Sequence, residues 1–163
     1  MSLSRAYVGL GSNLQAPAEQ VRAGLKELGA LPDTRLGPVS ALYRSPPMGP
    51  PDQPDYINAV AALDTTLAPL NLLEHLQAIE AAHGRVRGRH WGPRTLDLDL
   101  LLYGDLELRE DRLTVPHPGM HERAFVLYPL AEIAPQLRIP GRGALQDLLQ
   151  ACPRAGLEKV VQA

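Results

Sequence analysis

Two aspartates, Asp97 and Asp99, stand two residues apart in a leucine-rich run that is typical of a strand over residues 95–103. Residues two apart on a strand share a face, so both carboxylates point one way and the alternating leucines are buried behind them. Carboxylates about 7 Å apart repel each other unless a cation lies between them, and Mg²⁺ takes such oxygen ligands together with water and phosphate. A solvated strand face has the same pattern, so the interpretation depends on the residues that precede it.

A cationic segment leads directly into this strand. Residues 84–94 hold four arginines, one histidine and no acid, with glycine at positions 84, 88 and 92. Arginine binds phosphate through its planar fork, and phosphoryl transfer needs metal and arginine to neutralise a polyphosphate under a closing loop. The alternative is a surface loop whose arginines serve solubility, but the neighbouring Asp97 and Asp99 favour phosphoryl transfer. Trp91, in mid-segment, fits either a cover for a flat heterocycle or a cap on the core edge.

Other candidate residues keep two interpretations each. Tyr56 and Asn58 share a strand face, where they either stack on and hydrogen-bond an aromatic ligand or form a partly buried edge pair. His117 lies between two prolines and either touches phosphate or is structural. The segment 9–13 has two glycines but lacks the third glycine of a dinucleotide loop and the G-K-[ST] of a P-loop, so we expect a strand-to-helix turn in which Asn13 caps the helix. His83 is expected to be exposed to solvent.

Strands and helices alternate in an order that predicts the fold class. Strands are expected at 5–10, 39–43, 56–66 and 95–103, and helices at 17–28 and 69–83, with a proline loop at 45–55. This β-α-β-β-α-β order is that of a ferredoxin-like α/β (α+β) sandwich with a mainly antiparallel sheet. A hairpin after residue 104 and helices near 126–133 and 144–151 follow, and the core pattern does not account for them.

Composition narrows the class of protein. The 163 residues suit a single domain over 1–163, with 45% hydrophobic residues, one cysteine and a net charge of −2. That charge argues against a general polyanion partner, and no apolar run is long enough to span a membrane. A single cysteine excludes an internal disulfide, which favours a cytoplasmic protein. Together with the charge and the lack of a long apolar run, this predicts no nucleic-acid or membrane partner.

The chain resembles the 6-hydroxymethyl-7,8-dihydropterin pyrophosphokinase family over nearly its whole length. The most specific block is Trp91-Gly92-Pro93-Arg94-Thr95-Leu96-Asp97-Leu98-Asp99-Leu100-Leu101. Further matching segments are 9–14, 43–47, 52–58, 113–117 and 132–135, in the family's order. The resemblance implies an enzyme of folate biosynthesis, a diphosphokinase that moves pyrophosphate from ATP to the pterin hydroxymethyl group and releases AMP. It also implies a three-layer α-β-α sandwich with a ferredoxin-like core and two Mg²⁺ ions.

The resemblance assigns roles residue by residue. The catalytic positions are Arg85, Arg94, Asp97 and Asp99, and the two aspartates are also the metal ligands. The ATP side comprises Gln77, Glu80, Arg85, Arg87, Trp91, Arg94, Arg112, Thr114, His117 and Arg123. The pterin side comprises Ser45, Pro46, Met48, Tyr56, Asn58, Trp91 and Phe125. The expected partners are these small-molecule substrates alone, on a monomer.

Two departures and two alternatives accompany the resemblance. The stretch Gly88-Arg89-His90 is shorter than in a well-known bacterial member, and Pro118 stands where a tyrosine is often found, so ATP contacts are the least secure transfer. A phosphotransferase for another heterocycle would lack the Tyr56, Asn58 and Phe125 set. A nucleotide- or RNA-binding module would carry stacking aromatics without paired metal carboxylates.

Overall fold

The computed structural model describes residues 3–13, 16–46, 54–83, 96–154 and 156–160 of the chain. The first elements are β1 (Ser4–Ser12), α1 (Pro17–Leu28), β2 (Thr34–Val39), β3 (Tyr43–Ser45), β4 (Tyr56–Thr65), α2 (Pro69–Ala82) and β5 (Asp97–Tyr103). The later ones are β6 (Leu108–Arg109), β7 (Thr114–Val115), the 3₁₀ helix η1 (Met120–Glu122), α3 (Ala124–Ile133), β8 (Arg138–Ile139), β9 (Gly143–Ala144), α4 (Leu145–Gln150) and β10 (Glu158–Lys159).

The main sheet has the ferredoxin-like order that the element sequence predicts. Its strands run β10-β3-β4-β1-β5, with β2 also paired to β4, and every pairing is antiparallel. Strands β2 and β3 together occupy the place of one strand beside β4. With that pair counted as one, β1 to β5 and the two helices between them give β-α-β-β-α-β, so the predicted fold class is confirmed.

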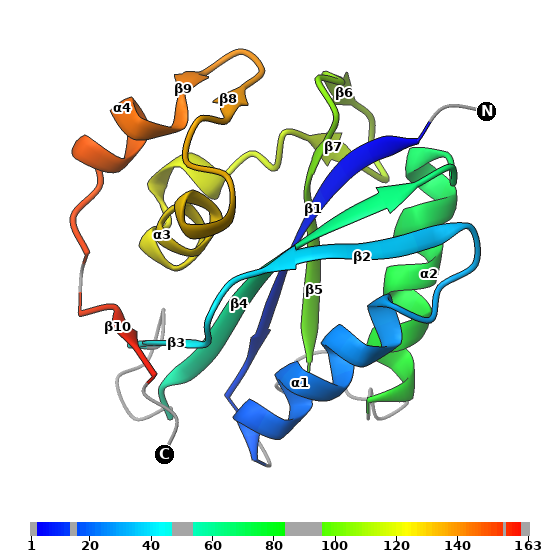
Figure 1. The fold of residues 1–163 in the computed structure, drawn as a ribbon, viewed down its shortest axis with the longest axis horizontal. Coiled ribbons are helices and arrows are strands. Elements are labelled where there is room, and N and C mark those ends of the chain that lie inside the picture. Colours follow the sequence, from blue (N-terminus) through cyan, green and yellow to red (C-terminus); the bar gives the residue numbers. More distant parts are fainter. Residues whose placement is uncertain (1–2, 14–15, 47–53, 84–95, 155, 161–163) are drawn as a thin grey trace.

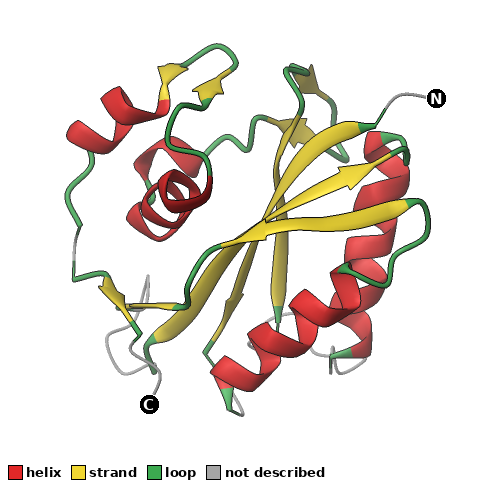
Figure 2. Cartoon of the chain, in the orientation of Figure 1, coloured by secondary structure: helices red, strands yellow, loops and turns green. Residues whose placement is uncertain are grey.

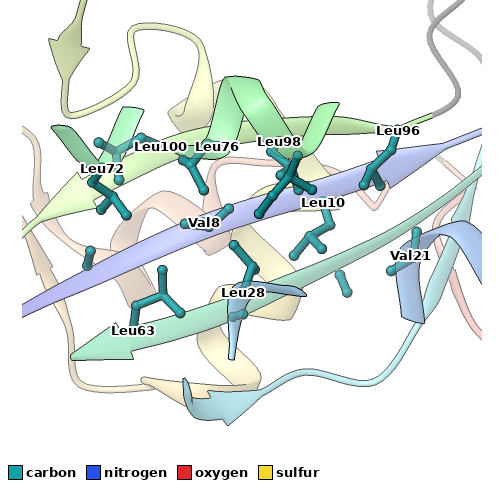
Figure 3. Packing of buried hydrophobic residues seen from close by; sticks show 14 of the residues in the cluster. Val8, Leu10, Val21, Leu28, Leu63, Leu72, Leu76, Leu96, Leu98 and Leu100 are labelled. Atoms are coloured by element: carbon teal, nitrogen blue, oxygen red, sulfur yellow. The ribbon is translucent and has the colours of Figure 1, made fainter. Parts of the chain in front are cut away.

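Helices cover both faces of the sheet and make three layers. Helices α1 and α2 lie on one side, and α3 and α4 lie on the other (Figure 1; Figure 2). Each interface has its own core. Figure 3 shows the first, where leucines of α1 and α2 pack on alternate residues of β1, β4 and β5. The second core joins the opposite face of the same strands to α3 and α4.

A bulge lets β5 serve both cores. The register between β1 and β5 shifts after Tyr7, which pairs with Leu102, while Val8 pairs with Leu100. The extra residue, Leu101, belongs to the second core, as does Leu102, whereas Leu100 belongs to the first. Three consecutive leucines are therefore all buried, and the residues before the bulge keep the alternation that separates the carboxylates from the core.

Strand β1 is longer than predicted. We expected residues 11–13 to break it, but it runs to Ser12 because Gly11 pairs with both neighbouring strands and Ser12 pairs with Ile57. Asn13 also does not cap α1. The residue before the helix is Ala16, which makes no side-chain cap, and the Asn13 amide nitrogen donates to the carbonyl oxygen of Pro54 at 3.3 Å.

The predicted strand at 39–43 is wrong. Only its two ends are in strands, Val39 at the end of β2 and Tyr43 at the start of β3, and residues 34–38, which form most of β2, lay outside any predicted strand. At the gap between β2 and β3, Ser40 restores the pairing: its backbone N–H donates to Val60 O at 2.9 Å, and its hydroxyl accepts from Val60 N–H at 2.9 Å. The strand β2 was not predicted because it contains a glycine and a proline, at positions 37 and 38, and both residues are unfavourable inside a strand.

Helix α2 occupies the predicted place and ends at Ala82. The helices α3 and α4 and the hairpin of β6 with β7 also lie where they were predicted, within two residues. Among the helices in the described ranges, none has the length and apolarity required to cross a membrane.

The packing of α2 against the sheet predicts a stability change. Leu76 is fully buried in the first core. Replacing it with alanine removes apolar contacts and leaves a cavity, so Leu76→Ala should lower the free energy of unfolding by about 2–5 kcal/mol in urea denaturation. Leu3, which is 59% exposed, is the matched control, and Leu3→Ala should change that free energy by less than about 0.5 kcal/mol. Equal losses in the two variants would contradict this packing.

Candidate active site

Strand β1 contributes a floor without side chains. Gly11 pairs with Asn58 of β4 on one side and Asp97 of β5 on the other, and Gly9 pairs with Asp99. Residues paired across antiparallel strands share a face, so the amide and both carboxylates project on the side that carries α3. The two glycines leave this part of the sheet surface open between them.

A cavity of about 170 Å³ lies over this floor. Residues from four strands and α3 line it: Gly9, Leu10, Gly11, Ser45, Pro46, Tyr56, Asn58, Ala59, Asp97, Asp99, Arg123, Phe125 and Val126. Eight of these were predicted as site residues from positions 45 to 125 of the sequence. The cavity therefore brings the two carboxylates that were predicted to bind metal, Asp97 and Asp99, together with the residues predicted for the pterin side, Tyr56, Asn58 and Phe125.

The orientation of Asn58 is set by β3. The Asn58 amide nitrogen donates to the hydroxyl of Ser45 at 2.7 Å, and both side chains are buried. The amide oxygen lies toward Gly11, where an added Cβ would approach it to 3.1 Å. Because its nitrogen is engaged, the side chain can offer its oxygen as an acceptor to a ligand with N–H donors.

Tyr56 stays a neutral phenol beside the carboxylates. Burial raises the pKa of Tyr56, and the negative charge of Asp97 raises it further. The phenol ring can therefore stack on a flat ligand and keep its O–H as a donor.

Glu80 holds the carboxylate-bearing strand from outside. Its side chain is 6% exposed, and one carboxylate oxygen accepts the backbone N–H of Leu98 at 2.8 Å. Leu98 lies between Asp97 and Asp99 in β5, which is the last strand on its side of the sheet among the described residues. Glu80 thus fixes the strand that presents both carboxylates, a contact that adds to the nucleotide-side role predicted for it.

The imidazole of His117 interacts electrostatically with the Asp99 carboxylate and the Arg123 guanidinium. Burial lowers the pKa of His117, the Asp99 carboxylate raises it, and the Arg123 guanidinium lowers it. Its Nδ1 accepts the backbone N–H of Gly119 at 3.2 Å, so a neutral ring carries its proton on Nε2. The His117 backbone N–H donates to Leu101 O at 2.9 Å, which ties this loop to β5.

The start of α3 adds an aromatic ring and a cation. Arg123 precedes the helix and Phe125 lies in its first turn. The Arg123 guanidinium carbon lies 5.8 Å from the centre of the Phe125 ring, a cation–π contact that places charge and ring together at the cavity.

Among the described residues, five predicted ones do not line this cavity: Glu80 and His117, whose contacts are given above, and Gln77, Arg112 and Thr114. Gln77 is exposed on α2, Arg112 is paired at 3.4 Å with Glu74, and the Thr114 hydroxyl lies 3.5 Å from Glu110 O. Five others, Met48, Arg85, Arg87, Trp91 and Arg94, lie outside the described residues. Sequence reasoning missed the floor role of Gly9 and Gly11, because the predicted strand ended at residue 10 and so left out Gly11.

His83 is buried, contrary to the prediction of an exposed side chain. Its side chain is 9% exposed, with Nδ1 2.7 Å from Gln20 Oε1 and Nε2 2.8 Å from Glu27 Oε2. It joins the end of α2 to α1, and neither partner could be identified from helical periodicity alone.

A ferredoxin-like sheet whose cavity combines two carboxylates, an arginine, two aromatic rings and a buried amide indicates an enzyme that transfers phosphoryl groups to a flat heterocycle. A profile of the family described as 7,8-dihydro-6-hydroxymethylpterin-pyrophosphokinase (HPPK) matches residues 7–135. The chain belongs to this family.

Individual relatives carry the name of the same enzyme family. The chain is 58% identical over 158 residues to the 2-amino-4-hydroxy-6-hydroxymethyldihydropteridine pyrophosphokinase of Pseudomonas aeruginosa, covering 97% of this chain and 98% of that one. It is 52% identical over 145 residues to the enzyme of the same name from Haemophilus influenzae, covering 89% and 91%. A crystal structure of Plasmodium falciparum HPPK-DHPS matches 91% of this chain at TM-score 0.71 and 14% identity. This chain covers 43% of that longer one, and the likeness supports the fold alone.

The charges around His117 predict opposite pKa changes in two variants. In chelator-treated protein, Asp99→Asn removes the charge that stabilises the imidazolium, so the pKa of His117 should fall. Arg123→Gln removes the opposing charge, so that pKa should rise. An NMR titration of the ring Cε1–H measures both, and shifts in the same direction would contradict the placement.

Proposed function

We propose that this cavity is where the family reaction takes place, with pterin and triphosphate bound side by side. The reaction transfers a pyrophosphoryl group to 6-hydroxymethyl-7,8-dihydropterin in folate biosynthesis, with ATP as co-substrate. The hydroxymethyl oxygen gives up its proton to solvent and bonds to the β-phosphorus of ATP, the bond from that phosphorus to the bridging α-phosphate oxygen breaks, and AMP leaves with that oxygen. The observation that carries the proposal is that one cavity holds both the Asp97 and Asp99 pair and the Tyr56, Asn58 and Phe125 set.

The pterin side is built from two layers. Tyr56 comes from the sheet and Phe125 from α3, so their rings can enclose a planar bicycle between the layers. The Asn58 oxygen accepts from donors on the pterin edge, since the Asn58 nitrogen is held by Ser45. Pro46 narrows the same wall, and Met48 and Trp91 complete the set by resemblance.

The metal side fits magnesium. Asp97 and Asp99 offer oxygen donors on one face of β5, and Mg²⁺ is commonly held by one or two carboxylates with phosphate and water in the remaining positions. Among the described residues no cluster of three or more such ligands exists, so the protein supplies two carboxylates and leaves room for phosphate oxygens. When bound, two Mg²⁺ ions neutralise the phosphate oxygens and stabilise the leaving AMP oxygen.

The nucleotide side uses cations around these carboxylates. Arg123 and the neutral ring of His117 lie beside Asp99, where they can donate to phosphate oxygens. Arg85 and Arg94 are proposed to bind the transferred phosphates, where charge develops in the transition state. The remaining nucleotide contacts proposed by resemblance are Gln77, Glu80, Arg87, Trp91, Arg112 and Thr114.

The wider assignment follows the substrates. We propose one domain over residues 1–163 that acts as a monomer on two small molecules, without a nucleic-acid or membrane partner. ATP use and folate biosynthesis favour a cytoplasmic location.

Removal of one carboxylate charge tests the metal site. Asp97→Asn or Asp99→Asn should lower kcat by at least about a hundredfold, because the charge that holds the metal is lost. The assay follows AMP formed from ATP, Mg²⁺ and the hydroxymethyl pterin, with AMP and ADP separated chromatographically. Asp64→Asn removes a carboxylate of β4 that pairs with Arg5 at 2.7 Å outside the cavity, and it should keep wild-type kcat. ADP as the product, or full activity in the Asp97 variant, would refute the proposal.

A floor substitution tests the pterin side. In Gly11→Ala the new Cβ would lie 3.1 Å from the Asn58 oxygen, so the amide must move and its bond to the pterin weakens. We expect KM for the pterin to rise about tenfold, the value of one good hydrogen bond. Gly9→Ala is the matched control, because its Cβ meets only Leu101 methyl groups at 3.5 Å or more, and KM should rise less than about threefold. A larger effect at Gly9 would place the pterin elsewhere on the floor.

A further inference from the structure

A second cavity lies outside the site described above. It measures about 430 Å³ and is bounded by the β6–β7 hairpin, the segment 115–118 and the turn between β8 and β9. None of the residues that line it lines the first cavity. Its volume falls within the range of small-molecule sites, about 300–1,000 Å³.

Two arginines from different hairpins converge on this cavity. Arg109 belongs to β6, and Arg142 belongs to the turn that joins β8 to β9. Within the described parts of the chain, neither guanidinium has a hydrogen bond or an ion pair with another residue. Two unpaired forks facing one hollow are suited to a doubly charged oxyanion, because each can hold two of its oxygens.

The remaining walls restrict what else can bind. Pro116, Pro118 and Pro140 have no backbone N–H, so they offer rigid apolar surfaces. The one carboxylate, that of Glu107, lies against the turn, where an added Cβ at Gly141 would be 2.8 Å from its Oε1. Glu107 repels an anion placed beside it but accepts hydrogen bonds from hydroxyl groups, so the lining matches a ligand with one anionic end and one hydroxyl-bearing end.

We propose that this second cavity binds a phosphate monoester whose phosphate is held by Arg109 and Arg142 and whose hydroxyl groups face Glu107. The site is distinct from the first cavity and uses no residue proposed as catalytic, and it shares one wall residue, Thr114, with the proposed nucleotide contacts. Its apolar wall, Pro116 and Pro118, flanks His117, so an occupant would contact the loop that borders the first cavity.

Titration with glycerol 3-phosphate, followed by ¹⁵N–¹H NMR of the full chain, tests this site. We expect saturable shifts of the Arg109, Gly141 and Arg142 amides, while the Gly9 and Gly11 amides report binding in the first cavity. Glycerol, which lacks the phosphate, should produce no saturable shift. Arg109→Gln or Arg142→Gln should each weaken binding by at least about tenfold, the loss of one charged hydrogen-bonding partner.

Arg138→Gln is the matched control. Arg138 is an exposed arginine of β8 that does not line the cavity, so this variant makes the same charge change and should alter affinity by less than about twofold. All three substituted side chains are exposed, so the folded spectrum should persist in each variant. Non-saturating shifts, shifts confined to the Gly9 and Gly11 amides, or equal weakening in all three variants would overturn the proposal. Because binding is read without turnover, its failure would leave pyrophosphoryl transfer untouched.

Discussion

The position of β1 between β4 and β5 is the constraint on which the site depends. A register slip of one residue would move every side chain to the opposite face. With the observed register, Gly11 lies between Asn58 and Asp97, so the amide and the carboxylate project from the same face on either side of a position without a side chain. The leucines behind them fill the α1 and α2 core, so hydrophobic burial and site geometry are fixed by the same pairing.

An edge strand bears the carboxylates, and edge strands need support on their unpaired side. Two side elements supply it here. Glu80 accepts the N–H of Leu98, and the N–H of His117 donates to Leu101 O. The first contact comes from the helix layer and the second from the loop that carries a charged neighbour of Asp99. Satisfying these backbone groups of β5 therefore also holds α2 and the loop of His117 next to the strand that carries Asp97 and Asp99.

Much of this could be predicted from the sequence, for physical reasons that vary along the chain. The alternation before Asp97 and Asp99 and the strong periodicity of α2 identified their elements, since burial follows the period directly. Tyr56 and Asn58 shared a face as predicted. Phe125, more than sixty residues later, was grouped with them by the family resemblance and by no local pattern, and all three line the same cavity. The split of β2 from β3 depends on Ser40 bonding to Val60, and the burial of His83 depends on partners in α1, so both follow from long-range contacts that no local pattern contains.

The last third of the chain falls outside the β-α-β-β-α-β pattern, yet it contributes three of the residues that line the cavity, Arg123, Phe125 and Val126. Helix α3 supplies Phe125 and lies next to Arg123. Glu132 at its other end accepts from the backbone N–H of Ala41 at 3.0 Å and from the Tyr43 hydroxyl, which fastens the helix to the strand that orients Asn58. Helix α3 is held on the ferredoxin-like sheet by the second hydrophobic core and by the two hydrogen bonds of Glu132. Because Phe125 and Val126 come from α3 and both carboxylates come from β5, substitutions in the helix can reshape one wall of the cavity without changing the strand that carries Asp97 and Asp99.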